Sequence, residues 1–300
     1  IKNKKGVILR IERDMSEKDE DDESSKSINP HANEPKKVDA QYNGLSYNPP
    51  VDDFDRSLRP VKPNAKAFTV PDFYSEKFDN GLTVIGSQST ESPLVYFYIE
   101  MEGGHLLEGD KKVNIGTAMV TASMMGEGTQ KLTTEEFSRE LEKLGSSISF
   151  NSGTMSSSVF VSCLKENVDP TLALLKDALF EPRFDDEDFK RIKNQILENL
   201  KTQKSNPSIM ARKAWGSIMF EGTILEDYYY GNYKSLSKIG LDDVKSFYNQ
   251  FYSPNVSTLV ISGDISQSEA MGKLDFLKAW GNTNVTIPSM PELTMPESTT

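Results

Sequence analysis

The pattern of apolar and polar residues divides the chain into a polar first part and a long region of regular periodicity. Residues 7–11 alternate apolar and charged side chains, a period of two that predicts a half-buried strand within residues 1–13. Between Asp14 and Tyr42 almost no apolar residue occurs. Such a stretch cannot bury enough surface to offset its ordering entropy, so residues 14–66 are predicted to form an acidic, proline-containing linker.

Residues 67–281 carry the periodicities of a folded domain. Two apolar runs flank Asp79-Asn80-Gly81, which is a strong hairpin signal. Thr133 stands three residues before Glu136, a capping box that begins an amphipathic helix. Antiparallel groups of strands separated by runs of helices predict an α+β domain, with a mainly antiparallel sheet packed against a layer of helices. Residues 282–300 return to Thr, Ser, Pro and Met and are predicted to be a second linker.

The remaining strands and helices are predicted from the spacing of apolar residues, which is two for a strand and about 3.6 for a helix. Strands are predicted over residues 94–101, 146–152, 157–164 and 257–262. Helices are predicted over residues 116–125, 168–180, 186–206, 241–252 and a final segment ending near 279, and one further helix carries Met210, Ala214 and Ile218. The single cysteine, Cys163, falls in the strand over residues 157–164 and is interpreted as a small buried thiol without an activating partner.

Charge and composition narrow the function classes. The chain has 34 Lys and Arg against 45 Asp and Glu, a formal net charge of −11. Phosphate neutralisation needs a surplus of basic residues, so the balance argues against nucleic acid as a partner. No run approaches the roughly 20 apolar residues of a membrane span, so no transmembrane segment is predicted. Because the chain begins at Ile1 without Met or an apolar leader, we expect a piece of a longer polypeptide.

Metal chemistry has few possible ligands in this sequence. The only histidines, His31 and His105, lie far apart, so no pair at helical spacing is available for a zinc site. His105 is interpreted as a surface or hydrogen-bonded loop residue and Glu127 as an exposed turn residue, neither with a catalytic role. One cysteine excludes an intramolecular disulfide and leaves the compartment open, although the periplasm or cell envelope is favoured for a bacterial source.

Several short segments follow one another in an order that resembles a known family. They are Asn80–Val84, Gly104–Glu108, Gly116–Ala118, Gly128-Thr129, Leu144-Gly145, Phe189–Pro207, Tyr230-Gly231, Phe251–Asn255 and Leu259–Asp264. Over residues 70–280 this series resembles the pitrilysin-like zinc metallopeptidases, the family of insulin-degrading enzyme and mitochondrial processing peptidase. Each segment alone has low specificity, whereas their order and spacing together are specific.

The resemblance implies a zinc site that this sequence has lost. Catalytic members carry His-x-x-Glu-His on the helix before the Gly-Thr pair and a further Glu ligand on a later long helix. The matching positions hold Met119, Ala122, Ser123 and Asn199, which supply neither imidazoles, general base nor anionic ligand. Glu198 is adjacent, but one residue along a helix turns a side chain by about 100°. The expectation is a degenerate domain with no catalytic residue, no metal and no other cofactor of its own.

The same resemblance implies the wider assembly. Four such domains in two halves would close around a peptide, with zinc held in the first, catalytic half. Residues 1–13 would then be the terminal strand of a preceding domain, residues 14–66 the connector, and residues 282–300 the link to a following domain. The expected partners are the catalytic half, in the same polypeptide or in a partner subunit, and a peptide substrate. The expected function is a non-catalytic domain of a zinc metalloendopeptidase that helps to enclose its substrates.

Two alternatives from other classes remain open. The fold could serve as a non-proteolytic scaffold or assembly subunit, as the related core proteins of a respiratory complex do. The other alternative is an acidic adaptor that steers the protein to a membrane, and only the charged linker supports this hypothesis. A His-x-x-Glu-His motif upstream of Ile1 would favour the peptidase over the scaffold.

In catalytic relatives a strand at the sheet edge pairs with extended substrate, and the corresponding stretch here is residues 146–152. Phe150 and Asn151 are then nearest the matching peptide-binding position, and Asn151→Pro is expected to remove a backbone donor there. The alternative is that Ile148 and Phe150 fill the core while another domain covers the edge.

Overall fold

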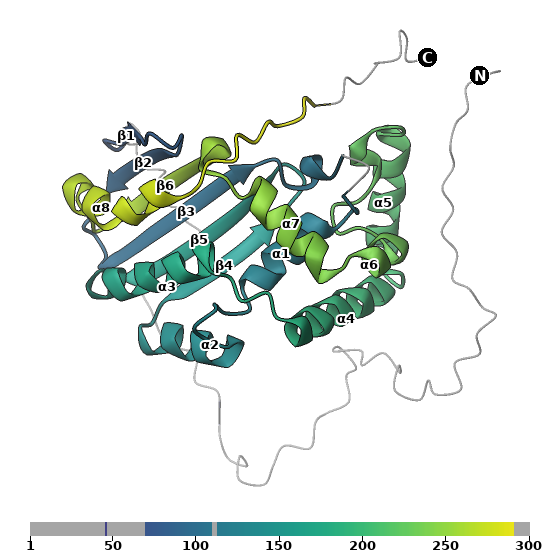
Figure 1. Cartoon of the computed structure of the whole chain (residues 1–300), viewed down its shortest axis with the longest axis horizontal. Helices are drawn as coiled ribbons and strands as arrows, with labels where there is room; N and C mark the ends of the chain where they lie inside the picture. Colours follow the sequence, from purple (N-terminus) through teal and green to yellow (C-terminus); the bar gives the residue numbers. More distant parts are fainter. Residues whose placement is uncertain (1–45, 47–69, 110–112, 291–300) are drawn as a thin grey trace, which may run out of the picture. The chain divides into compact units, whose positions relative to one another are not determined.

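The computed structural model describes Ser46 and residues 70–109 and 113–290. The strand predicted within residues 1–13 and nearly all of the linker predicted over residues 14–66 lie outside these described residues. Figure 1 shows the described elements in colour.

In the described part of the chain, six strands form one sheet in the order β1-β2-β6-β3-β5-β4. Their bounds are β1 Tyr74–Lys77, β2 Thr83–Gln88, β3 Leu94–Glu102, β4 Ser147–Ser152, β5 Ser156–Leu164 and β6 Ser257–Gly263. All neighbouring pairs are antiparallel except β2 and β6, which are parallel. The mainly antiparallel sheet predicted from the sequence is therefore confirmed, and β4 is one of its two edge strands.

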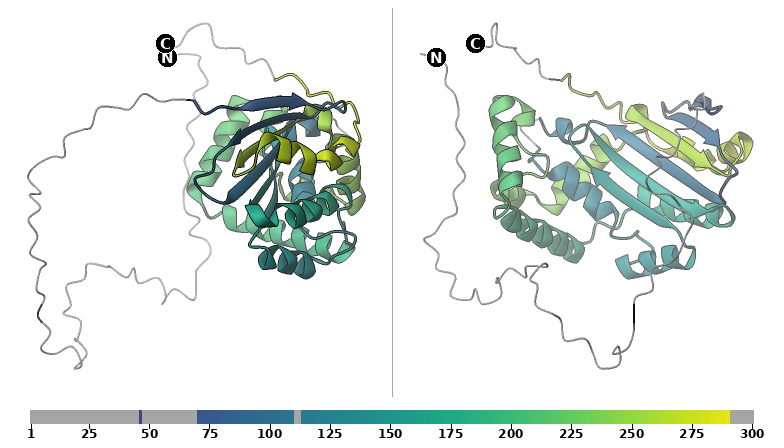
Figure 2. Two further views of the ribbon diagram at one scale, coloured as in Figure 1. Left: turned by 90° about the vertical axis from the view of Figure 1, so that its left-hand side faces the viewer. Right: turned by 180° about the vertical axis from the view of Figure 1, so that it is seen from behind.

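Helices cover one face of this sheet. The α-helices are α1 Thr117–Met125, α2 Thr134–Lys143, α3 Val168–Phe180, α4 Asp186–Gln203, α5 Pro207–Met219, α6 Tyr233–Lys238, α7 Leu241–Phe251 and α8 Gln267–Lys273. Short 3-10 helices are η2 Gly104–Gly109, η3 Lys165–Asn167, η4 Ile224–Glu226, η5 Pro254–Val256 and η6 Asp275–Ala279. From behind, the right view of Figure 2 shows strands β3 and β5 without helices in front of them.

Buried and exposed side chains alternate along β3, which explains why helices cover only one face of the sheet. Val95, Phe97, Ile99 and Met101 are buried towards the helices, whereas Tyr96 on the opposite face is 37% exposed. Helix α1 is buried on almost every side, which accounts for an apolar and small-residue sequence without a polar stripe. None of the helices in the described part of the chain is long and apolar enough to cross a bilayer.

The signals for turns and caps that the sequence carries are present in the structure. Gly81, at φ 100°, occupies the left-handed conformation in the turn between β1 and β2. The Asn80 side-chain amide donates to the carbonyl oxygens of Leu277 and Trp280 at 2.8 and 3.2 Å, which ties this turn to the last helical segment. Thr133 and Glu136 form the predicted capping box at the start of α2.

Cys163 lies on β5 with its side chain buried, opposite Val95 on β3. Its interpretation as a buried thiol is confirmed. Burial in these apolar surroundings raises the pKa of the thiol to about 11.

The helix predicted to carry Met210, Ala214 and Ile218 exists as α5, yet none of its residues is buried. Trp215 is 66% exposed and Ile218 47%. The apolar stripe thus correctly predicted that these residues form a helix, but its side chains are not part of the core. Beyond η6, residues 281–290 have no regular secondary structure, although Val285 and Ile287 pack against the core.

Candidate functional site

Helices α1 and α4 carry the four positions that the family resemblance predicts to match a zinc site, and the two helices contact each other. Met119 and Ala122 are buried in α1, Ser123 is half-buried beside them, and Asn199 is exposed on α4. The Ser123 hydroxyl donates to the Met119 carbonyl oxygen at 3.0 Å, and Ala122 offers no ligand atom at all. This set of donors does not suit a metal ion, which needs imidazole, thiolate or carboxylate ligands.

The same holds for the rest of the described body. Within residues 70–109 and 113–290, no group of three or more His, Cys, Asp or Glu side chains is placed to hold a metal ion.

His105 is the one described histidine, and it is buried rather than on the surface. Its Nδ1 lies 2.6 Å from the Glu108 carboxylate, and its Nε2 lies 2.9 and 3.0 Å from the carbonyl oxygens of Ile224 and Asp227. Carbonyl oxygens only accept hydrogen bonds, so Nε2 carries a proton. The sequence was compatible with a surface histidine or a hydrogen-bonded loop histidine, and the second interpretation is right. Through these contacts His105 holds the segment around η4 in place.

Glu108 connects the histidine to the start of α1. Its carboxylate accepts hydrogen bonds from the backbone N–H groups of Gly116 and Ala118, at 3.0 and 2.6 Å. Burial lowers the pKa of His105, but the hydrogen bond and charge of Glu108 and the two carbonyl contacts raise it, and the net direction is upward. His105 and Glu108 are therefore a buried structural ion pair, which the i, i+3 spacing in Gly104–Glu108 could have indicated.

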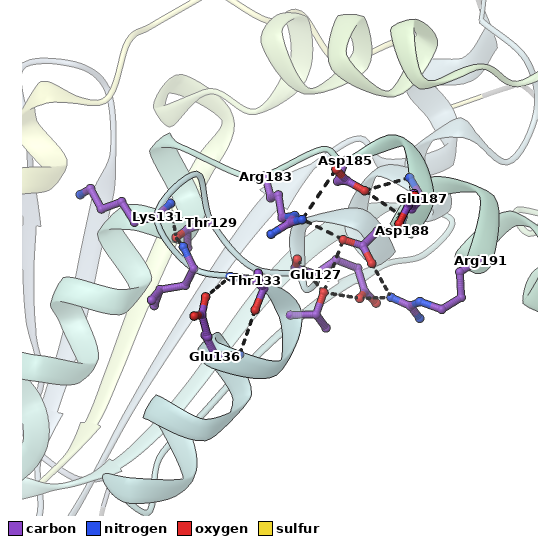
Figure 3. Close-up of polar contacts among 12 residues, drawn as sticks. Glu127, Thr129, Lys131, Thr133, Glu136, Arg183, Asp185, Glu187, Asp188 and Arg191 are labelled. Atoms are coloured by element: carbon purple, nitrogen blue, oxygen red, sulfur yellow. Dashed lines mark hydrogen bonds and ion pairs between the residues drawn. The ribbon is translucent and has the colours of Figure 1, made fainter.

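Glu127 is also less exposed than the sequence suggested, because it belongs to a network of charges (Figure 3). Its carboxylate pairs with Arg191 of α4, which also binds Asp188 at 3.2 Å. The Thr134 hydroxyl donates to the Glu127 carbonyl oxygen at 3.0 Å. The network fixes the turn after α1 against the starts of α2 and α4.

The candidate peptide-binding strand β4 lies at the sheet edge, as expected. Gly153 donates its N–H to the Ser156 carbonyl oxygen at 2.8 Å, in register with the β4–β5 pairs. Antiparallel pairing alternates, so the amide of Asn151 faces β5, while those of Phe150 and Ser152 face the outer edge, which no other strand among the described residues covers and which is called the free edge below. A second hydrogen bond supports this alternation. The backbone N–H of Lys165, just after β5, donates to the carbonyl oxygen of Pro93, just before β3, so the odd-numbered residues of β5 bond to β3 and the even-numbered ones to β4.

The two candidate residues on this strand therefore differ. Phe150 turns its side chain into the core and its backbone N–H and C=O groups outward, whereas Asn151 has an exposed side chain and a backbone bonded to β5. The expectation that Asn151→Pro removes an edge donor is corrected accordingly.

A cavity of about 480 Å³ lies beside Asn199, between the end of α4, the start of α5 and a row of three tyrosines. Its lining consists of Ile196, Asn199, Thr202, Gln203, Asn206, Ile209, Tyr228, Tyr229 and Tyr230. Sequence reasoning missed this cavity because its wall combines segments some thirty residues apart, although the run of three tyrosines was a visible signal.

Comparison with known proteins adds independent information. The profile of insulinase, peptidase family M16, matches residues 83–231, and that of the peptidase M16 inactive domain matches residues 238–299. The non-peptidase homolog YmxG of Helicobacter pylori is 26% identical over 64% of this chain and 44% of its own length.

Solved structures share the fold. A peptidase M16 inactive domain from Pseudomonas fluorescens superposes with a TM-score of 0.67 and 21% identity, over 75% of this chain and 54% of that one. The periplasmic protease PqqL from Escherichia coli gives a TM-score of 0.66 and 19% identity, over 76% of this chain and 26% of that one. The chain thus spans less than half the length of the curated relative and a quarter of PqqL.

Proposed function

Because this chain belongs to the insulinase family of peptidases, family M16, we propose that it is a non-catalytic domain of a zinc-dependent metalloendopeptidase. In this proposal it helps to enclose peptide substrates in a chamber whose zinc and active site lie in another domain or a partner subunit. The observation that carries the proposal is the chemistry at Met119, Ala122, Ser123 and Asn199. Two helices of the family's fold are retained in contact, and none of these four side chains can bind or activate a metal-bound water.

The free edge of β4 supports a role in holding peptide. Phe150 and Ser152 direct backbone groups away from β5, so an extended peptide can add to the sheet there by main-chain hydrogen bonds. Such pairing needs no particular side chain, and a domain without metal ligands can therefore keep it. Solvent-facing edge groups are also the usual place for a further strand to pair.

Binding of a fluorescent extended peptide to this chain tests the proposal. Ser152→Pro removes one outward N–H and should weaken binding roughly 2- to 10-fold, the value of one hydrogen bond of about 0.5–1.5 kcal/mol. Ser152→Ala is the matched control, because it deletes the hydroxyl that contacts Ser157 at 2.9 Å and keeps the amide. Equal affinities for both variants and the unaltered chain would remove the edge from the proposal.

A non-proteolytic scaffold of the same fold is the second candidate. It is favoured by one observation, the similarity to a relative named as a non-peptidase homolog. Isolation of the complete protein separates the two: chelator-sensitive peptide cleavage by the complete protein or its complex supports the first candidate, and a stable complex without cleavage supports the second.

A further inference from the structure

The half-buried ammonium group of Lys213 lies where α4, α5 and Tyr228 meet, and we infer that it binds a carboxylate group of an extended peptide. The groove that would hold this carboxylate has a volume of about 260 Å³ and lies between the end of α4, helix α5 and the segment 226–233. Figure 1 shows α4, α5 and α6 together at the end of the fold opposite α8. The inference rests on the proposed function, since it takes the domain to capture peptides, but it concerns other residues than the β4 edge.

The first argument is that Lys213 lacks a counter-charge. Its Nζ donates to the side-chain oxygen of Gln203 at 3.0 Å and lies 5.0 Å from the ring centroid of Tyr228. Among the residues that the structure describes, no carboxylate pairs with it, and burial lowers its pKa without any charged group to raise it again. Removing a charge from water is costly unless an opposite charge accompanies it, so a carboxylate that reaches Lys213 supplies the missing partner.

The second argument is a local excess of positive charge. The groove is lined by three lysines and a single carboxylate, namely Lys201, Lys204, Lys213 and Glu226. Glu226 is already engaged, because its carboxylate accepts a hydrogen bond from the backbone N–H of Gly222 at 2.8 Å. The whole chain has a net charge of −11, so the groove has the opposite sign of charge to the chain as a whole. An anionic group of a peptide is attracted to such a local excess.

The third argument is the apolar surface beside the lysines, which favours a peptide over a bare anion. Leu200 and Met210 line the same groove, and Met210 is 38% exposed. Lys213 also lines a second groove of about 320 Å³, where Trp215 and Met155 are 66% and 48% exposed. Apolar side chains of a peptide can cover these residues while its carboxylate pairs with Lys213, which an inorganic anion cannot do.

The experiment measures binding of four octapeptides of Ala, Ile and Ser, each with a fluorescent label on its N-terminus. One is uncharged with an amidated C-terminus, the second has a free C-terminal carboxylate, and the other two are amidated with a central Glu or Lys. The unaltered chain should bind at least one of the two carboxylate peptides about fivefold or more tightly than the uncharged one, and should not prefer the Lys peptide. The preferred peptide shows whether the site takes a terminal or a side-chain carboxylate.

Substitutions assign this preference to one side chain. Lys213→Gln removes the charge, keeps a donor for Gln203 and should abolish the preference, whereas Lys213→Arg keeps the charge and should retain most of it. Lys190→Gln is the matched control, the same change at an exposed position of α4 outside the groove, and should leave all affinities within about twofold. Melting temperatures show that each variant is folded.

The outcomes separate this inference from the proposed function. No preference for a carboxylate, equal effects of Lys213→Gln and Lys190→Gln, or an equal loss of preference in Lys213→Arg would each overturn the inference. Weakening of every peptide by Ser152→Pro without any preference for a carboxylate would overturn it and leave the proposed function standing. A preference that Lys213→Gln abolishes and Ser152→Pro leaves unchanged would support it and remove only the β4 edge.

Discussion

The backbone amides of Phe150 and Asn151 point to opposite sides of strand β4. Asn151 belongs to the hydrogen-bonded pair with Ser158 of β5, and Phe150 faces the free edge. Neighbouring residues on this strand thus have separate tasks, one in holding the hairpin and one in presenting groups to a further strand.

A proline scan of β4 should reproduce this alternation. Asn151→Pro removes a ladder donor and leaves an acceptor on β5 unpaired, so the free energy of unfolding should fall by roughly 1–3 kcal/mol. Ser152→Pro loses an outward N–H and the hydroxyl contact with Ser157 but no ladder hydrogen bond, and should cost less, because proline is tolerated on edge strands in that orientation. Urea denaturation of both variants checks the prediction. A larger loss for Ser152→Pro would show that the register is wrong.

Stability should depend on pH through His105. Its folded-state pKa is raised, so the stabilisation is fully present below its unfolded value near 6.5 and is lost as pH rises through the higher folded value. His105→Gln should remove this dependence and, by leaving Glu108 buried without its cation, cost roughly 3–5 kcal/mol at pH 6. His31→Gln is the control, since it is the only other histidine. Denaturation curves from pH 5 to 9 that remain parallel for the chain and His105→Gln would contradict the ion pair.

Zinc binding should require four substitutions together. The unaltered chain should hold no stoichiometric zinc and cleave no peptide. Met119→His, Ala122→Glu, Ser123→His and Asn199→Glu combined should restore one zinc per chain, because α1 and α4 are already in contact. The triple variant that keeps Asn199 is the control and should bind more weakly. Metal analysis of the dialysed proteins decides the matter, and a folded quadruple variant without zinc would show that the matching positions are wrong.

The charge network at the start of α4 should contribute measurably to stability. Glu127→Gln weakens the pair with Arg191 and should lower the free energy of unfolding by about 1 kcal/mol, since the Glu127 side chain is only 14% exposed. Glu135→Gln, an exposed acidic residue in the first turn of α2, is the control and should change it little. Thermal melts at low and high salt test this. Identical losses for both variants would assign no special role to the network.

Local signals in the sequence predicted local structure well. The Asn80-Gly81 turn, the Thr133–Glu136 capping box and helix α3 all appear where the pattern places them, because each depends on residues within a few positions. The parallel pairing of β2 with β6 joins residues some 175 positions apart, and no local pattern indicates it.

The candidate site shows the same division. The residue types at Met119, Ala122, Ser123 and Asn199 are visible in the sequence, and their match to the ligand positions of a zinc site stays a prediction. The burial of His105 could not be predicted, since it depends on carbonyl oxygens of Ile224 and Asp227, more than a hundred residues later. The directions of the backbone amides along β4 likewise depend on the pairing with β5. For this reason the prediction that Asn151 carries an outward-facing donor was wrong.

The single buried thiol gives this protein an intrinsic reporter of the contact between its sheet and its helices. Cys163 lies on β5, between β3 and β4, and the pKa of its thiol is raised to about 11, so it is both covered and protonated near neutral pH. Only about one thiol in a thousand would be thiolate at pH 8 even if reagent could reach it. Alkylation should therefore require helix α3, which carries Thr171 beside this thiol, to move away from β5, and its rate should measure how often that part of the core opens.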